Sequence, residues 1–380
     1  MVTGMILIDL QKAFDTINYE ILLRKMCYLG FSDNTILWFK SYLTDRTFFV
    51  NLENTFSEAS VLECGVPQGS ILGPILFLLY VNDMPQAVSK CDILLYADDT
   101  CLVFSDKCVS TIESHLSDDF NSLCDWFEDN KLSIHLGEDK TKCILFSRRR
   151  KKENLSIKRG NISIKQHSKV TYLGCLLDED HSGESMANKV LGKINGRLKF
   201  LYRKNEYLTK SLRRLLCNAL IQPHFDFASV AWYPLLSKRL LKKVTVAQNK
   251  CIRFCLQSNS RKHVGYEEYD QINWLPVELR FHQSVCTSVH NFFNDKAPGY
   301  MADIFLRDDA KRTRNSILHL KKPLAKTNGQ KSLSFIGPSI WNQLPSEIKI
   351  LTNNNTFKHQ VKSLFLGKLK EKENDIYLRN

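Results

Sequence analysis

Two adjacent carboxylates inside an apolar segment constrain this 380-residue chain more than any other feature of its sequence. Asp98 and Asp99 stand in the tetrapeptide YADD, and the runs ILLY and TCLVF around the turn predict a hairpin over residues 93–104. Neighbouring carboxylates repel each other and are poor strand residues. One interpretation is a simple Asp-rich turn, because Asp is favoured in turns. Since both flanking strands are so apolar, we favour a pair that a divalent cation neutralises.

Two further segments carry residues of chemical interest. Residues 5–10 read MILIDL, the pattern of a buried strand that ends at Asp9, although a single Asp in this place is better explained as a helix N-cap. Residues 65–74 read GVPQGSILGP and predict a turn that enters an apolar helix. Its glycines allow a backbone to approach a substrate closely, and Gln68 offers donors and acceptors. An ordinary tight loop before a helix explains this segment as well.

Charge is divided unevenly along the chain. Residues 1–147 hold 10 Lys/Arg against 21 Asp/Glu, a net charge of −11, whereas residues 148–380 hold 43 against 19, a net charge of +24. This division suits a protein that uses carboxylates for metal chemistry and a basic surface for a polyanion. A charge run begins the basic part, and we expect it to be exposed and to bind nucleic acid: Arg148, Arg149, Arg150, Lys151 and Lys152. A nuclear localisation signal is the competing interpretation of the run.

The 12 cysteines are scattered and show no zinc-knuckle spacing. Cys251 and Cys255 share a predicted helix face and could form half of a metal site, but buried, reduced thiols explain them better. No apolar run reaches the roughly 18 residues that span a bilayer, and no signal peptide opens the chain. We therefore expect a nuclear or cytoplasmic protein that is not secreted and has no membrane partner.

The pattern of elements predicts an α+β fold. An antiparallel sheet should carry Asp9 and the YADD hairpin on adjacent strands, with the helices after Ser70 and Val109 packed on one face. From residue 184 to about 294 the periodicity is helical. We place boundaries so that the domains cover residues 1–147, 148–183, 184–295 and 296–380.

The motif order IDLQKAFD, GVPQGSILGP and YADD resembles motifs A, B and C of reverse transcriptases. The amino-acid sequences of these motifs resemble those of the non-LTR branch, the LINE-type elements such as jockey and the chicken-repeat group. The resemblance continues through the segments ILLRKMCYLG, WFKSYLTDR, ILFLLYVNDM, WFEDNKLSIHLGEDKTK and VTYLG. Later segments, WLPVELR, APGY and IWNQLP, resemble the region downstream of the polymerase in the same elements. RNA virus polymerases and group II intron maturases share a palm with this family, but the segments IDLQKAFD, SILGPILF and IWNQLP argue against them.

The resemblance implies an RNA-directed DNA polymerase that uses an RNA template, a DNA primer and deoxynucleoside triphosphates. Asp9, Asp98 and Asp99 match the metal-binding carboxylates, with Mg²⁺ as the expected cofactor and Mn²⁺ as the alternative. Leu10 would lend its backbone carbonyl to a metal. Lys140 matches the motif D lysine, a proton donor to pyrophosphate, although a solvated lysine at a strand end explains it almost as well.

The resemblance also implies roles in binding. Phe14 matches the aromatic residue beneath the incoming sugar, although core packing is its plainer interpretation. Gln68 and Gly69 match the loop that touches the nucleotide and the template. The primer-grip turn is matched by Tyr172, Leu173 and Gly174. Asp15 matches the family too, and we expect a structural role for it.

The family pattern names the four segments: a polymerase palm with motifs A to D, a basic connection with the primer-grip strands, a mostly α-helical basic thumb-like domain and a basic C-terminal region. Only eight residues precede Asp9, and none is Lys or Arg. From this we expect an N-terminally truncated or element-derived copy without the fingers and the endonuclease. By itself it should bind RNA–DNA hybrids but extend a primer barely or not at all. The alternative is a catalytically inactive nucleic-acid-binding protein derived from a retroelement. No protein partner is indicated.

Overall fold

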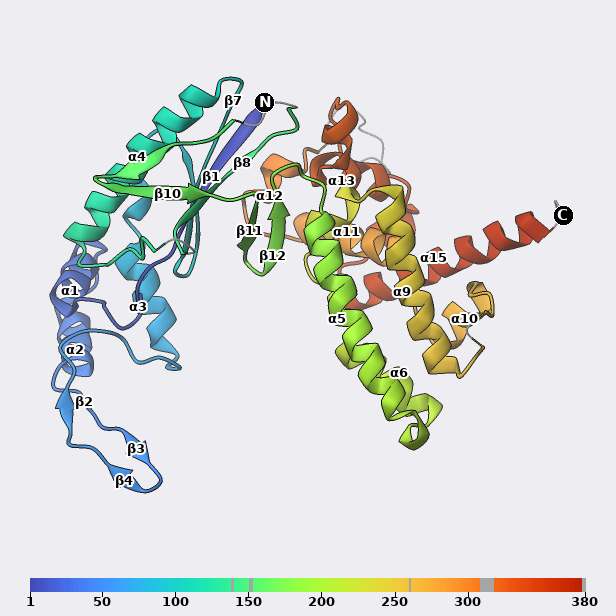
Figure 1. Cartoon of the computed structure of the whole chain (residues 1–380), viewed down its shortest axis with the longest axis horizontal. Helices are drawn as coiled ribbons and strands as arrows, with labels where there is room; N and C mark the ends of the chain where they lie inside the picture. The colour runs from blue at the N-terminus through green and yellow to red at the C-terminus, as the bar shows by residue number, and fades with distance from the viewer. Residues whose placement is uncertain (138–139, 150–152, 260, 308–317, 378–380) are drawn as a thin grey trace. The chain divides into compact units, whose positions relative to one another are not determined.

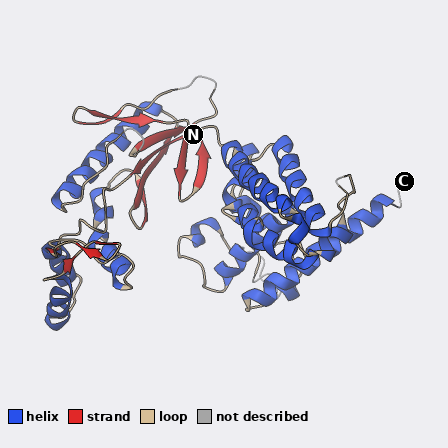
Figure 2. Ribbon diagram, turned by 60° about the horizontal axis from the view of Figure 1, so that its bottom comes forward, coloured by secondary structure: helices blue, strands red, loops and turns tan. Residues whose placement is uncertain are grey.

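The structure is a computed structural model of residues 1–380, and it describes residues 1–137, 140–149, 153–259, 261–307 and 318–377 (Figure 1). The chain divides into two compact units, Met1–His181 and Ser182–Asn380. Figure 2 shows that the strands belong to unit 1, whereas unit 2 is built of helices. Unit 1 is therefore a mixed unit of strands and helices, and unit 2 is a helical unit.

In its described residues, unit 1 contains a central sheet, four α-helices and three two-stranded pairs. Its elements are β1 (Val2–Ile8), α1 (Tyr19–Tyr28), α2 (Asp33–Leu43), β2 (Thr47–Phe48), β3 (Asn51–Leu52), β4 (Thr55–Phe56), β5 (Ser60–Val61), α3 (Leu72–Val81), the 3-10 turn η1 (Met84–Ala87), β6 (Asp92–Tyr96), β7 (Asp99–Asp106), α4 (Val109–Asp129), β8 (Lys142–Phe146), β9 (Ile157–Arg159), β10 (Ile162–Gln166), β11 (Lys169–Tyr172) and β12 (Cys175–Asp178).

Six strands form the central sheet in the order β6-β7-β1-β8-β10-β9. β1 lies between β7 and β8 and is antiparallel to both, with Ile8 opposite Thr100. β10 runs parallel to β8, which is the one parallel pair among the described strands. The other described strands form separate two-stranded pairs, of which β11–β12 matters for the site.

The two faces of β1 are buried against different partners, because side chains alternate along a strand. Ile6 and Ile8 belong to the main core, which α3 and α4 close. Met5 and Leu7 belong to a smaller cluster on the opposite face, together with Val170 of the β11–β12 hairpin. The helices thus cover one face of the sheet and the hairpin covers part of the other.

Helix α4 shows why these residues fold in this way. Its apolar positions recur at helical spacing, and the buried stripe consists of Ile112, Leu116, Phe120, Leu123 and Phe127. Burial of each such side chain contributes roughly 1.5–3 kcal/mol. The helix lies so close to β1 that a Cβ added at Gly4 would be 2.5 Å from Ile112 Cγ2. Glycine is therefore required at this position by packing.

Unit 2 is helical apart from a single bridge between Arg307 and Leu320 in its described part. Its elements are α5 (Glu184–Arg203), η2 (Asn205–Tyr207), α6 (Lys210–Leu220), α7 (Gln222–Asp226), α8 (Ser229–Trp232), η3 (Tyr233–Leu235), α9 (Lys238–Leu256), α10 (Tyr266–Gln271), α11 (Val277–Phe293), α12 (Met301–Ile304), η4 (Thr327–Lys331), α13 (Leu333–Trp341), α14 (Ser346–Lys349) and α15 (Asn354–Tyr377). Buried aromatic residues such as Trp341 and Phe357 join α11, α13 and α15 in one core.

The predicted α+β class is confirmed, because a largely antiparallel sheet with helices on one face precedes a helical region. The finer division into four domains stays a prediction below the level of the two units. All 12 cysteines are free, and Cys251 and Cys255 are buried. Across the described ranges, no helix combines the length and the apolar character that crossing a bilayer requires.

Candidate active site

The sheet brings the three predicted carboxylates together. Ile8 pairs with Thr100, so Asp9 follows β1 at the level of Asp99, the first residue of β7. Burial raises the pKa of Asp99, and the negative charges of Asp98 and Asp9 raise it further. Asp9 therefore lies close enough to the YADD turn for its charge to be felt there, despite the long separation in sequence.

The turn that presents these carboxylates is a tight one. Tyr96 pairs with Asp99, which leaves Ala97 and Asp98 as the two central residues. Ala97 has a φ of 52° and Asp98 does not have a positive φ, the pattern of a type II′ turn. A positive φ costs a non-glycine residue roughly 1–2 kcal/mol. The hairpin thus accepts both backbone strain and charge repulsion at the residues that it exposes.

Asp9 is held by the segment before β8. Its amide donates a hydrogen bond to Thr141 Oγ1 at 3.2 Å, and its carbonyl accepts one from His135 N at 2.8 Å. Lys140 Nζ lies 3.5 Å from Asp9 Oδ2, with side-chain exposures of 55% and 42%. An ion pair this exposed is worth at most about 1 kcal/mol, so Lys140 can leave Asp9 at little cost.

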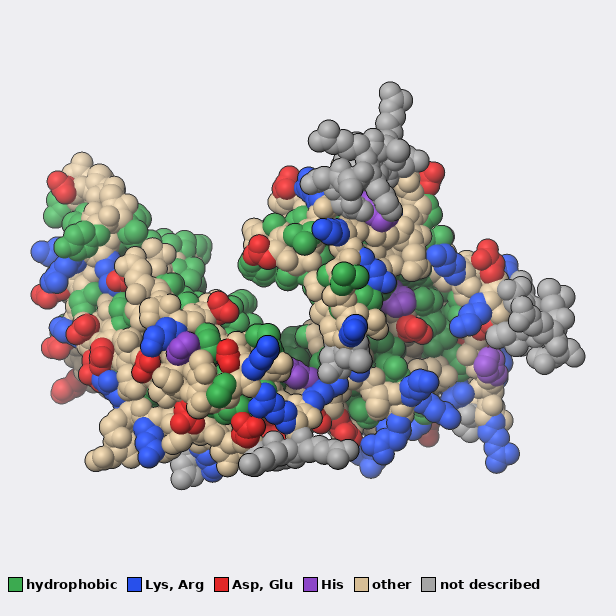
Figure 3. All heavy atoms as spheres, turned by 90° about the horizontal axis from the view of Figure 1, so that it is seen from above, with side chains coloured by type: hydrophobic (Ala, Val, Ile, Leu, Met, Phe, Trp, Pro, Cys, Tyr) green, Lys and Arg blue, Asp and Glu red, His purple; other side chains and the backbone are tan. Residues whose placement is uncertain are grey.

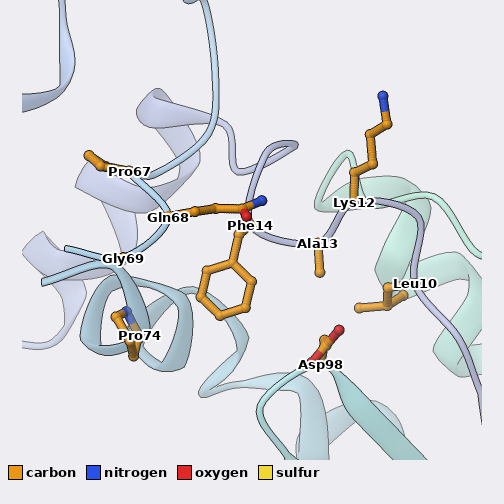
Figure 4. A pocket seen from close by; sticks show the side chains of 9 residues that line it. All are labelled: Leu10, Lys12, Ala13, Phe14, Pro67, Gln68, Gly69, Pro74 and Asp98. Carbon is orange, nitrogen blue, oxygen red and sulfur yellow. The ribbon is translucent and has the colours of Figure 1, made fainter. Parts of the chain in front are cut away.

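A pocket of about 420 Å³ joins the three motifs. Its lining residues come from motifs A, B and C and are Leu10, Lys12, Ala13, Phe14, Pro67, Gln68, Gly69, Pro74 and Asp98. Figure 4 shows the Phe14 ring in the middle of these residues, while the Lys12 side chain extends away from Asp98. The Phe14 ring also stacks on Phe77 of α3, with ring centroids 4.7 Å apart, so Phe14 both packs on the core and faces the pocket.

The loop of motif B is fastened to motif A. Gln68 Nε2 donates a hydrogen bond to Asp15 Oδ1 at 2.8 Å. Gly65 approaches the same residue so closely that an added Cβ would lie 2.7 Å from Asp15 O. At the end of the loop, Ser70 Oγ accepts a hydrogen bond from Gly73 N at 2.9 Å and so caps the start of α3. Asp15 is the residue that fixes the position of Gln68 at the pocket.

The hairpin β11–β12 carries the three residues predicted for the primer grip. Leu173 and Gly174 form its turn with φ angles of 46° and 79°, as in a type I′ turn. Burial raises the pKa of Tyr172, and the neighbouring Cys101 and Asp99 raise it further. Tyr172 therefore lies on the same side of the sheet as the carboxylates.

The basic run is only partly described. Arg148 and Arg149 are exposed, and Arg148 donates hydrogen bonds to the carbonyl oxygens of Asp180 and His181. Arg149 Nη1 lies 3.2 Å from Glu153 Oε1. The predicted residues Arg150, Lys151 and Lys152 lie outside the described residues. The two arginines thus already bind groups of unit 1 itself.

The geometry bears on metal binding in two ways. Within the part of the chain that the structure describes, no three His, Cys, Asp or Glu side chains are already arranged around a common ion position. The charges of Asp98 and Asp9 nevertheless contribute to the raised pKa of Asp99, and carboxylate oxygens are the ligands that Mg²⁺ and Mn²⁺ prefer. For these carboxylates to bind a common ion, their side chains would have to rearrange and Lys140 would have to leave Asp9.

Sequence reasoning missed one residue of the site. Thr141 is 2% exposed and positions the amide of Asp9, yet nothing in its surroundings in the sequence distinguishes it from a loop threonine. Only its spatial relation to β1 reveals the role.

Comparison with known proteins adds to this geometry. The family profile described as reverse transcriptase (RNA-dependent DNA polymerase) matches residues 1–177. A probable RNA-directed DNA polymerase from transposon BS of Drosophila melanogaster is 26% identical over 258 residues, which are 65% of this chain and 28% of that protein. The RNA-directed DNA polymerase from mobile element jockey of the same organism is 27% identical over 256 residues, which are 65% and 27% of the two chains. The chain thus spans about a quarter of the length of these relatives.

Telomerase structures show a distant likeness. The telomerase of Candida tropicalis in complex with a fragment of telomeric RNA has a TM-score of 0.34 and 16% identity, over 75% of this chain and 46% of that one. These values are too low to bear on the site. Over its first 177 residues the chain is similar to reverse transcriptase domains, and the relatives that it resembles are RNA-directed DNA polymerases of LINE-type mobile elements.

Proposed function

We propose that this chain carries the catalytic site of an RNA-directed DNA polymerase, which extends a DNA primer on an RNA template. The observation that supports this most is the meeting of Asp9 with the Asp98–Asp99 turn beside a pocket lined by motifs A and B. Such a site needs oxygen ligands for metal ions next to a space for a nucleotide. The residues present fit both needs.

Asp9, Asp98, Asp99 and the carbonyl of Leu10 would hold two Mg²⁺ ions, with Mn²⁺ as a substitute. Bound there, the metals would lower the pKa of the primer hydroxyl and neutralise the charge of the leaving pyrophosphate. The chain's own contribution is to keep the carboxylates in place, through the hydrogen bonds of the Asp9 backbone and through the turn at Ala97. Lys140, whose Nζ lies next to Asp9, would give a proton to pyrophosphate.

The pocket would select and orient the nucleotide. The Phe14 ring is fixed by its stack on Phe77, so its bulk can exclude a ribose 2′-hydroxyl. Gln68, held by Asp15, and Gly69 would touch the nucleotide and the template. The turn of Tyr172, Leu173 and Gly174 would hold the end of the primer near the carboxylates. Orientation of this kind can contribute roughly 7–11 kcal/mol to lowering a barrier.

The test is metal binding followed by primer extension. Titration calorimetry with Mn²⁺ on the 380-residue chain should show binding that the double variant Asp98→Asn, Asp99→Asn loses. A primer on an RNA template should then be extended with Mg²⁺ and deoxynucleoside triphosphates, and the same variant should abolish the extension. Extension that survives in the variant would overturn the assignment of these carboxylates.

A second candidate is binding of nucleic acid without catalysis. It is favoured by the scarcity of positive charge at the pocket, where Lys12 is the one cation among the nine lining residues. Slow extension that needs high concentrations of nucleotide is therefore expected even if the metals bind. Full metal binding with no incorporation of a nucleotide would favour this second function.

We further propose that the run from Arg148 to Lys152 contributes to nucleic-acid binding, in a protein of the nucleus or the cytoplasm. Replacing Lys151 and Lys152 with Ala should weaken binding to all sequences and flatten its salt dependence, since phosphate contacts carry no base preference. Unchanged binding together with loss of nuclear import would show that the run is a localisation signal instead.

A further inference from the structure

Helices α5 and α9 of unit 2 lie side by side (Figure 1) and form a groove of about 500 Å³ between their exposed sides. Neither the motifs of the sequence nor the catalytic site includes this groove. Its lining residues are Asn188, Leu191 and Asn195 from α5, and Arg239, Lys242, Lys243, Val246, Ala247 and Lys250 from α9. The α9 wall therefore carries the positive charge, whereas the α5 wall is uncharged.

The α9 wall is cationic because of how the helix is patterned. Leu240, Val244 and Cys251 are buried on the core side of α9, and the cations lie on the neighbouring face. From residue 239 to residue 250 the helix rises by about 16 Å, at roughly 1.5 Å per residue. The positive charge is thus spread over three turns, which suits a chain of successive phosphates better than a single anion.

Most of this charge is not neutralised by the protein. Among the described residues, no ion pair joins Lys242, Lys243 or Lys250 to a carboxylate. Arg239 lies 3.5 Å from Glu184 Oε1, but the two side chains are 73% and 48% exposed. An exposed pair of this kind is worth at most about 1 kcal/mol, so a phosphate can displace Glu184. Figure 3 shows that Lys and Arg side chains gather on one face of unit 2.

The α5 wall has no cation within the groove. Asn188 and Asn195 offer amide donors and acceptors, and Leu191 adds an apolar surface opposite Val246. Beside them Gly192 leaves open backbone, because a Cβ added there would meet no atom within 4 Å. Amides can pair with the edges of unstacked bases, and apolar side chains can pack on their faces. A duplex, by contrast, would bring a phosphate backbone to both walls.

We propose that this groove binds a single strand of nucleic acid, with its phosphates along α9 and its bases toward α5. The proposal rests on the proposed function for the nature of the ligand. It does not depend on catalysis, because no residue of the groove belongs to the catalytic site. The strand would be the unpaired template or another single-stranded segment of the RNA or DNA on which the protein acts.

The experiment measures binding of the 380-residue chain to fluorescent oligonucleotides by anisotropy, in EDTA and without nucleotides, over a series of salt concentrations. The probes are single-stranded RNA, single-stranded DNA and a duplex of equal length. The groove variant is Lys242→Gln, Lys243→Gln, Lys250→Gln. A matched control, Lys358→Gln, Lys368→Gln, Lys372→Gln, makes the same charge change on α15.

The groove variant should bind single strands at least tenfold more weakly than the control variant does. Its slope of log affinity against log salt should fall by about 2, since each phosphate contact with a single strand contributes roughly 0.7. Comparison of the RNA and DNA probes tells which strand is preferred. Equal losses in both variants would overturn the proposal, because binding would then follow net charge and not the groove.

Two further variants test the α5 wall. Asn188→Ala with Asn195→Ala should reduce affinity for single strands and leave that for the duplex unchanged. Gly192→Gln should do the same while increasing helix stability, since Gln is a better helix former than Gly by roughly 0.5–1 kcal/mol. A greater loss for the duplex than for single strands would overturn the assignment of the ligand. Because binding is measured in EDTA and without nucleotides, the outcome of this test is independent of the test of catalysis.

Discussion

Replacement of Asp98 by Asn should stabilise the metal-free chain. Three carboxylates are neighbours at the end of the sheet, and Asp98 contributes to the raised pKa of Asp99. Two like charges about 4 Å apart repel by about 1 kcal/mol in water. Because Asp98 is exposed and belongs to this group of three carboxylates, Asp98→Asn should raise the free energy of unfolding by about 1–2 kcal/mol. For a unit of this size the change corresponds to roughly 2–8 °C in Tm.

In the presence of a divalent metal, the unmodified chain should become more stable than the Asp98→Asn variant. A ligand at ten times its dissociation constant stabilises a folded protein by about 1.4 kcal/mol. The unmodified chain should therefore gain stability on addition of Mg²⁺, while Asp98→Asn should gain little, because it lacks a ligand. Thermal unfolding in EDTA and in Mg²⁺ measures both effects. Asp92→Asn, at the other end of β6, is the matched control. It should change neither the stability in EDTA nor the stability gained from Mg²⁺.

The pH dependence has a definite sign. The folded chain binds the Asp99 proton more tightly than the unfolded chain does, since the pKa of Asp99 is raised in the fold. Ionised Asp99 therefore costs stability at neutral pH, and this cost disappears as the pH falls through the raised pKa. The advantage of Asp98→Asn in EDTA should shrink over the same range. A lower Tm for Asp98→Asn than for the unmodified chain in EDTA, or an equal gain from Mg²⁺ in both, would refute the reasoning.

Three other variants test the supports of the site. Gly4→Val should lower the free energy of unfolding by roughly 1–3 kcal/mol in urea, because the side chain would overlap α4. Tyr80→Phe should cost about 1–3 kcal/mol, since the buried hydroxyl donates to Asn130 O at 2.6 Å and its loss leaves that carbonyl unpaired. Asp15→Ala should weaken the binding of a fluorescent nucleotide with Mn²⁺ by about 2- to 10-fold, the effect of one hydrogen bond to Gln68, with no comparable loss of stability.

The sequence predicts well those features that depend on neighbouring residues. The hairpin around YADD and the stripe of α4 follow from periodicity, and the structure has them as β6–β7 and Val109–Asp129. Burial of alternate or helically spaced side chains is the physical basis of both patterns. The parallel pairing of β10 with β8 has no such local signal, because it depends on how a distant segment returns to the sheet.

Some contacts within the site could be expected from the sequence, and others depend on how distant segments fold together. The proximity of Asp9 to the YADD turn was expected from the resemblance in motif order, since neither segment alone requires it. The hydrogen bond between Gln68 and Asp15 could not be predicted, because many polar residues of the sequence could donate to an exposed carboxylate equally well. The same is true of Thr141, whose hydroxyl becomes a partner of Asp9 only after β8 has paired with β1.

The balance of charge at the proposed site explains how binding steps must be coupled there. Asp9, Asp98 and Asp99 supply three negative charges, against which Lys12 and Lys140 are the nearby cations. A triphosphate brings several more negative charges, so without metal it would enter a site of its own sign. Two Mg²⁺ ions would add four positive charges and change the sign of the site. Metal binding should therefore precede or accompany nucleotide binding, and Lys140, freed from Asp9 by the metal, would then be able to face the phosphates.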